Sequence, residues 1–285
     1  MIQSMTGFGK HVAQLSTKKI TIEIKSLNSK SIDLNARMPS NYREKELEIR
    51  KIIASSLVRG KVDFSLFIEI TGEEITTKVN EVVVRQYMKQ LEAIAGGDDL
   101  KLMEMALRFP DTTKTEKEDI DQTEYTTILE TLHVALANIN EFRSEEGAVL
   151  ENDFKQRIVT LHKLLAEVLN IDPDRKTDIR TRLEKAVQDL KVNVDENRFE
   201  QELIYYLEKY DITEEKVRLA NHLAYFTKTL ESADSNGKKL AFISQEIGRE
   251  INTIGSKANF APMQQLVVQM KDELEKIKEQ MLNVL

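Results

Sequence analysis

The pattern of hydrophobic and polar positions divides the chain into an early part with strand periodicity and a later part with helical periodicity. Apolar residues alternate over 20–24 and again over 62–70, and this period of two is typical of half-buried strands. Between Pro39 and Gly60 the apolar residues recur at helical spacing, which predicts one helix. From Asn80 onward the periodicity is helical.

The second half of the chain is expected to be wholly helical. A long helix is predicted from about Thr126 to just before Pro173, because the residue preceding a proline disfavours the helical conformation. A further helix is predicted to end at about Val192, with a turn at 195–197. The polar, charged segment 110–125 is poor in large apolar residues and is expected to be a surface excursion or mobile loop.

The last third carries three amphipathic helical stripes, over 219–230, 240–254 and 266–281, with a predicted turn at 234–237 between the first two. A helix with one apolar side requires a partner helix from the same chain or from another subunit. The pattern as a whole predicts the α+β class, with an N-terminal sheet-plus-helix domain followed by a predominantly α-helical C-terminal region. The expected divisions are an α+β domain, a long-helix connecting region and a helical C-terminal domain, over 1–110, 126–195 and 196–285.

Composition narrows the range of functions. The 285 residues include no cysteine, which excludes disulfides, thiolate zinc sites and cysteine nucleophiles and favours a cytoplasmic location. No run of eighteen apolar residues occurs, so no membrane span is expected. The P-loop, GxGxxG, HExxH and GxSxG motifs are absent as well.

Charge is distributed unevenly along the chain. The net charge is −7, yet residues 1–72 carry 12 Lys or Arg and seven Asp or Glu, which makes this part +5 and the remainder −12. A basic N-terminal part joined to an acidic remainder suits a phosphate-binding surface beside a carboxylate-rich site.

Two rows of polar residues flank the first two C-terminal stripes at helical spacing. The members of each row are four, three and four residues apart, and they are Asp211, Glu215, Arg218 and His222, then Glu246, Glu250, Thr253 and Lys257. If the two stripes pack together, both rows line one groove.

Such a groove would hold the groups needed to hydrolyse a phosphodiester with a divalent metal. Carboxylates bind Mg²⁺ or Mn²⁺, the imidazole of His222 is a candidate metal ligand or general acid/base, and the cations Arg218, Arg249 and Lys257 bind phosphate oxygens. Spacing alone favours a plainer interpretation, in which these side chains form solvated helix salt bridges. Asp211 followed by Glu214 also resembles a capping box.

Two further groups of residues have a structural and a functional interpretation. His11, His133 and His162 lack clustered acids and are interpreted as structural. In the N-terminal part, polar residues close to strand ends could bind phosphates, or could equally serve turn formation and solubility. These residues are Asn28, Lys30, Arg37, Arg59 and Lys61.

Seven sequence blocks resemble the signatures of the YicC/YloC family of bacterial endoribonucleases, and together they span nearly the whole chain. They are SMTGFG at 4–9, EIKSLNSKSIDLNARMP at 23–39, LVRGKVD at 57–63, RSEEGAVL at 143–150, YDITEEKVRLANHL at 210–223, SQEIGREINTIGSKA at 244–258 and KDELEKIKEQMLNVL at 271–285.

The resemblance implies a cytoplasmic endoribonuclease that requires a divalent metal, acts on single-stranded RNA and assembles as a ring-like homo-oligomer, expected to be a hexamer. Glu202 is a further acidic candidate. Lys30 stands where the family often has arginine, and Gly248 where it often has a larger polar residue. The matching motif positions are Asp211, Glu214, Glu215, Arg218 and His222, then Gln245, Glu246, Arg249, Glu250, Asn252 and Lys257.

These arguments converge on a metal-dependent endoribonuclease of RNA turnover, using Mn²⁺ or Mg²⁺, with no membrane partner and no DNA substrate expected. The expected catalytic residues are His222, Glu246, Glu250, Lys257, Arg249 and Arg218. The expected metal ligands are His222, Glu246, Glu250, Glu215 and Asp211. The residues expected to bind RNA are Lys30, Arg37, Arg59 and Lys61.

Two alternatives remain open at the level of sequence. One is a non-catalytic RNA-binding or scaffolding homo-oligomer, in which the polar rows hold helices together. The other is metal-independent cleavage through the ribose 2′-hydroxyl.

Overall fold

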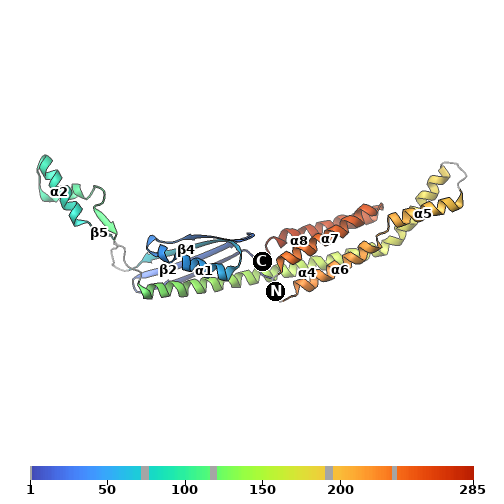
Figure 1. The fold of residues 1–285 in the computed structure, drawn as a ribbon, viewed down its shortest axis with the longest axis horizontal. Helices are drawn as coiled ribbons and strands as arrows, with labels where there is room; N and C mark the ends of the chain where they lie inside the picture. Colours follow the sequence, from blue (N-terminus) through green and yellow to red (C-terminus); the bar gives the residue numbers. More distant parts are fainter. Residues whose placement is uncertain (1, 72–76, 116–120, 190–194, 233–235) are drawn as a thin grey trace.

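The computed structural model describes residues 2–71, 77–115, 121–189, 195–232 and 236–285. The molecule is elongated, with a sheet packed near one end of a very long helix and a helical bundle along the other half (Figure 1). This architecture confirms the predicted α+β class with a mostly helical C-terminal region. Among the described residues, no helix combines the length and apolar composition needed to span a membrane.

The N-terminal sheet has four strands in the order β1-β2-β4-β3, with β1 and β2 antiparallel to their neighbours and β3 parallel to β4. The buried side chains alternate along the central strands, with Ile22 opposite Leu66, as the period of two predicts. One helix follows β3 after a short 3₁₀ turn, as expected between Pro39 and Gly60. The bounds are β1 Gly7–Gln14, β2 Lys18–Leu27, β3 Ile32–Arg37, the 3₁₀ turn Ser40–Lys45, α1 Glu46–Leu57 and β4 Gly60–Ile70.

A small separate unit is inserted between β4 and the long helix, and it lies beyond the end of the sheet (Figure 1). The predicted excursion 110–125 contains its second strand and the start of the long helix, so only part of that excursion is irregular. Residues 116–120 lie outside the described residues. The bounds are β5 Thr77–Val79, α2 Glu81–Ala95, α3 Asp99–Ala106 and β6 Thr113–Thr115.

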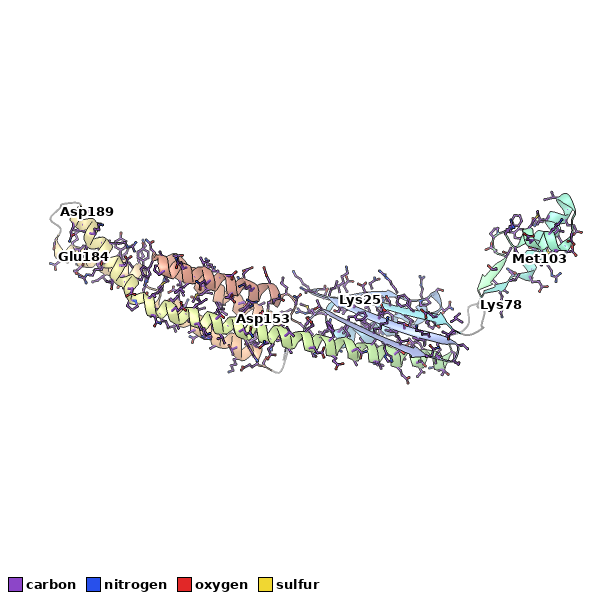
Figure 2. The ribbon with its side chains drawn as sticks, turned by 180° about the vertical axis from the view of Figure 1, so that it is seen from behind. Lys25, Lys78, Met103, Asp153, Glu184 and Asp189 are labelled. Carbon is purple, nitrogen blue, oxygen red and sulfur yellow. The ribbon has the colours of Figure 1, made fainter. Side chains whose placement is uncertain are left out.

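One continuous helix, α4, runs over Gln122–Asp189 and joins the two halves of the molecule. Its first part covers one face of the sheet and its later part enters the bundle. Figure 2 shows Asp153 near the middle of the molecule and Glu184 at the far end. The expectation that the helix ends before Pro173 is wrong, since Pro173 lies inside α4. The predicted end at about Val192 lies outside the described residues.

Buried ionic contacts hold α4 together where Pro173 removes a backbone hydrogen bond. Asp172 accepts hydrogen bonds from Arg175 Nε at 2.7 Å and from Lys216 Nζ at 2.8 Å, and Arg175 also donates to the Tyr210 carbonyl at 2.8 Å. Burial raises the pKa of Asp172, but the hydrogen bonds from Lys216 and Arg175 outweigh it and hold that pKa below its usual value. Tertiary contacts thus override the local signal of the proline.

The remaining helices complete the bundle. The predicted turn at 195–197 is wrong: Asp195 Oδ1 accepts a hydrogen bond from the Asn197 amide at 3.0 Å and caps the start of α5. In the predicted turn at 234–237, Gly237 begins α7, whereas 234 and 235 lie outside the described residues. The bounds are α5 Glu196–Lys209, α6 Thr213–Leu230, α7 Gly237–Lys257 and α8 Ala261–Met281.

The sheet and the bundle meet at a joint built on α4. Arg143 is almost fully buried and donates to the carbonyl oxygens of Leu57 and Met5 at 3.2 Å and to Ser26 Oγ at 2.5 Å. Burial lowers the pKa of this guanidinium. One turn further on, Gly147 leaves room for the Ile2 backbone, because a Cβ there would lie 2.1 Å from the Ile2 oxygen. The RSEEG block therefore fixes the N-terminal segment to the helix.

Candidate functional site

The two polar rows predicted from the sequence lie on α6 and α7, which pack side by side through their apolar stripes. A short connection makes the helices antiparallel, and Figure 1 shows them along α4. The predicted packing of the two stripes is therefore confirmed. The stripe residues Leu219, Leu223, Phe226 and Leu230 of α6 and Leu240, Ile243, Ile247, Ile251 and Ile254 of α7 are all buried.

At one end of this α6–α7 groove, Lys257 joins the two helices. Its Nζ donates to Glu215 Oε1 at 2.7 Å and to the Asp211 carbonyl oxygen at 2.9 Å. Glu215 is buried, and its second oxygen, Oε2, has no hydrogen-bond partner. The Asp211 carboxylate accepts from the amide and hydroxyl of Thr213, the first residue of α6, whereas Glu214 pairs with Arg218. The capping box that the sequence suggested does not form, because Ile212 occupies the N-cap position.

Further along the groove, Glu250 and His222 lie at about the same level. Each is seven residues, or about 10 Å, from the Glu215–Lys257 contact, and antiparallel helices bring such positions opposite each other. Glu250 is only 4% exposed, whereas His222 and Glu246 are half-buried. Within the part of the chain that the structure describes, none of these three side chains has a hydrogen-bond or ion-pair partner. Two carboxylates and an imidazole are thus free to act on a ligand.

The two arginines expected at this site point elsewhere. Arg218 is 55% exposed and forms an ion pair with Glu214 one turn earlier on α6. Arg249 lies on the other side of α7, in a shallow depression of about 530 Å³ between α7 and α8. We call this depression the α7–α8 groove. It is lined by Gln245, Gly248, Arg249, Asn252, Thr253 and Ser256 of α7 and Lys278 of α8.

The N-terminal cations fall into two places. Arg59 donates to the Val284 carbonyl oxygen at 2.7 Å, and with Lys30 and Lys238 it lines a cavity of about 480 Å³ between sheet and bundle. Arg37 and Lys61 lie on the strand face turned away from α4, where Figure 2 labels Lys25. The structure thus separates four residues that sequence reasoning treated as one RNA-binding set, and it gives Arg59 a structural partner.

Comparison with known proteins finds a matching family model for each half of the chain. The family described as endoribonuclease YicC-like, N-terminal region, matches residues 2–152, and the family described as endoribonuclease YicC-like, C-terminal, matches residues 168–285. The probable endoribonuclease YicC of Clostridioides difficile is 34% identical over 293 residues, and that of Haemophilus influenzae is 29% identical over 288 residues. Each alignment covers 100% of both chains.

The chain belongs to the YicC-like endoribonuclease family. Both polar rows lie within the part matched by its C-terminal model, and the sheet and the first part of α4 lie within its N-terminal model.

The metal expected for this YicC-like chain can be tested against its donor groups. The five expected ligands do not gather: Asp211 accepts hydrogen bonds from Thr213, Glu215 is neutralised by Lys257, and His222 and Glu250 lie about 10 Å further along the groove. Over the described ranges of the chain, no three His, Asp or Glu side chains form a group that could hold a metal ion. The described residues therefore do not bring three of the expected ligands together.

Sequence reasoning about the YicC-like site missed the contribution of the last helix. Lys276 and Lys278 flank the apolar stripe of α8 on opposite sides of Ile277, and the sequence alone does not tell which of the two flanks faces α7. Only the packing of α8 against Gly248 brings Lys278 to the α7–α8 groove. Gln245 and Asn252 were motif positions in the family resemblance, but their place opposite Lys278 required the tertiary structure.

Proposed function

We propose that the protein is an endoribonuclease that hydrolyses phosphodiester bonds in single-stranded RNA. It acts in RNA turnover in the cytoplasm as a homo-oligomer, expected to be a hexamer. Family membership carries this proposal, because the two family models cover both halves of the chain and relatives matched over their full length are named probable endoribonucleases.

We place cleavage in the α6–α7 groove, at His222 and Glu250. His222 is half-buried and has no partner among the described residues, and imidazole transfers protons near neutral pH without a large pKa shift. In hydrolysis, water attacks the phosphorus and His222 takes one proton of that water, while the bond from phosphorus to the leaving ribose oxygen breaks. That oxygen takes a proton from solvent water, and His222 later returns its proton to solvent. Glu250 and Glu246 orient the water by accepting its hydrogen bonds.

A divalent ion, Mn²⁺ or Mg²⁺, stays in the proposal as the cofactor that the family resemblance implies. One subunit does not supply three ligands within the described residues, so no step of the reaction is assigned to the ion. The ligands Glu246, Glu250 and His222 are retained as candidates, together with donors from RNA or a second subunit.

The decisive experiment is cleavage of an end-labelled single-stranded RNA by the purified protein, with Mn²⁺, with Mg²⁺ and with EDTA. We expect metal-dependent cutting that His222→Ala removes, with RNA binding retained. His162→Ala is the matched control, since His162 is an exposed histidine of α4 remote from the groove. Cutting that persists in EDTA and leaves a 2′,3′-cyclic phosphate would show that the ribose 2′-hydroxyl, and not water, attacks the phosphorus. The absence of cutting under every condition would refute the nuclease proposal.

The alternative function is a non-catalytic RNA-binding scaffold, and the Glu215–Lys257 ion pair between α6 and α7 favours it. A scaffold would lose stability or assembly, rather than cleavage, in Glu246→Ala and His222→Ala. Assembly itself is checked by light scattering of the full chain, in which a strict monomer would contradict the proposed oligomer.

A further inference from the structure

The α7–α8 groove has a chemical character unlike the rest of this acidic protein. The net charge of the chain is −7, yet no acidic side chain lines the groove among the described residues. Its lining instead combines two cations, Arg249 and Lys278, with the amides of Gln245 and Asn252. An acid-free depression with cations and amides is complementary to a polyanion that also carries hydroxyl groups.

The polar groups of the groove are available to a ligand. In the described part of the chain, the side chains of Arg249, Gln245 and Asn252 have neither an ion-pair nor a hydrogen-bond partner. Lys278 has one exposed ion pair, with Glu275 at 3.5 Å, and such a pair holds a lysine only weakly. Binding an anion there therefore breaks no strong internal contact.

Gly248 forms the floor of the groove. A Cβ at this position would lie 3.1 Å from Leu274 Cδ2 and 3.5 Å from Lys278 Nζ. Glycine inside a helix costs about 1 kcal/mol relative to alanine. Because Gly248 has no side chain, the space under the Lys278 ammonium stays open. The glycine therefore shapes the groove, which accounts for a residue that otherwise destabilises the helix.

We propose that the α7–α8 groove binds the sugar-phosphate backbone of single-stranded RNA, with phosphates on Arg249 and Lys278 and ribose 2′-hydroxyls on the amides of Gln245 and Asn252. This inference rests on the proposed function. Amides both donate and accept hydrogen bonds, as the 2′-hydroxyl does, so they favour RNA over DNA. Arg249 comes one residue before Glu250, about 100° away around α7, which places the bound strand within one helix width of the α6–α7 groove.

The test measures RNA binding separately from cleavage. Fluorescence anisotropy with a labelled 12-nucleotide RNA and its DNA counterpart, in EDTA, compares the wild type with Arg249→Gln and Lys278→Gln at several salt concentrations. Gel analysis after each titration confirms that the RNA is intact. We expect each variant to bind RNA about tenfold more weakly. Each should also lower the slope of log affinity against log salt by about 0.7, the value for one lost single-strand phosphate contact.

The chain offers a matched control on the same helix. Lys276 is 42% exposed against 39% for Lys278, but it pairs with Asp272 and Glu273 and lies outside the groove. Lys276→Gln should therefore leave both affinity and salt slope unchanged. Asn252→Asp, which introduces a carboxylate of almost the same shape, should weaken RNA binding, and Asn252→Ala should narrow the preference for RNA over DNA.

Several results would overturn the inference. Wild-type affinity and slope in Arg249→Gln and Lys278→Gln would show that RNA binds elsewhere, and an equal loss in Lys276→Gln would show a non-specific charge effect. A change of oligomer mass in the two groove variants would assign the groove to a subunit contact instead. The proposed nuclease function would survive all three results, since it fails only if the wild-type protein does not cut RNA.

Discussion

The buried carboxylate of Glu250 allows catalysis and stability to be separated in one substitution. Glu250 is 4% exposed and has no hydrogen-bond or ion-pair partner among the described residues. A largely buried charge without a partner destabilises the folded state, but the Glu250 oxygens are not among the fully buried atoms that lack a partner, so they keep some contact with water. Glu250→Gln keeps the shape and removes the charge, so we expect the free energy of unfolding to rise by about 1 kcal/mol or less.

The same substitution should have the opposite effect on activity. Loss of an oriented carboxylate in the reacting site lowers the rate by a factor of about 10² or more. The melting temperature, followed by circular dichroism, should rise by about 3 °C for each kcal/mol gained. Glu130→Gln, which alters an exposed carboxylate of α4, should change neither the cleavage rate nor the melting temperature.

The outcome that refutes this reasoning is a fall in stability in Glu250→Gln. A loss of 1 kcal/mol or more, with or without a loss of cutting, would mean that the carboxylate holds α6 and α7 together. The polar rows would then be structural, and the scaffold alternative would gain its strongest support.

Three other substitutions test separate parts of the structure. Lys257→Met leaves Glu215 buried without its partner and should lower the free energy of unfolding by about 1–3 kcal/mol, as measured by a denaturant titration. The double variant Lys257→Met/Glu215→Leu should recover the wild-type stability, because it removes the unpaired charge as well. Asp172→Asn should be less stable than the wild type above about pH 4, because a carboxyl whose pKa is lowered in the folded state stabilises that state only while it is ionised. The difference in stability between variant and wild type should therefore shrink as the pH falls below about 4. Thermal melts at pH 3 that show the same difference as at neutral pH would contradict this. Gly147→Ala should destabilise by about 1–3 kcal/mol in the same melts, since its Cβ would collide with the Ile2 oxygen, and wild-type stability would show that the N-terminal segment can move away.

The fold was largely predictable because its hydrophobic periods are regular. The alternation in β2 and β4 and the stripes of α6, α7 and α8 each identify one buried face, and the structure buries those faces. The errors concern local signals that tertiary contacts override. Pro173 suggests a helix end, but Asp172 and its two cations hold α4 continuous, and no pattern in the sequence foretells that network.

The site was predictable only in part. Helical spacing correctly placed Glu215 and Lys257 in contact between α6 and α7, because the phase of a helix fixes which residues flank its apolar stripe. Thr253, which the spacing put in the same row as Lys257, lines the α7–α8 groove instead. Spacing cannot tell which neighbour a long side chain selects, so the partner of Arg218 was missed. The phase of α8 against α7, which brings Lys278 to the α7–α8 groove, depends on packing at a glycine.

The continuity of α4 makes the molecule a lever. From the joint at Arg143 to its end at Asp189, α4 extends for about 70 Å at 1.5 Å per residue, so a tilt of about 5° at the joint displaces the far end by about 6 Å. That displacement is close to two nucleotide steps of a stacked strand, which are about 3.4 Å each. If a bound RNA strand contacts both the sheet and the bundle, the stiffness of the joint at Arg143 would set the register between the two contacts. A substitution that loosens this joint would then spread cleavage over neighbouring nucleotides before it abolished cleavage.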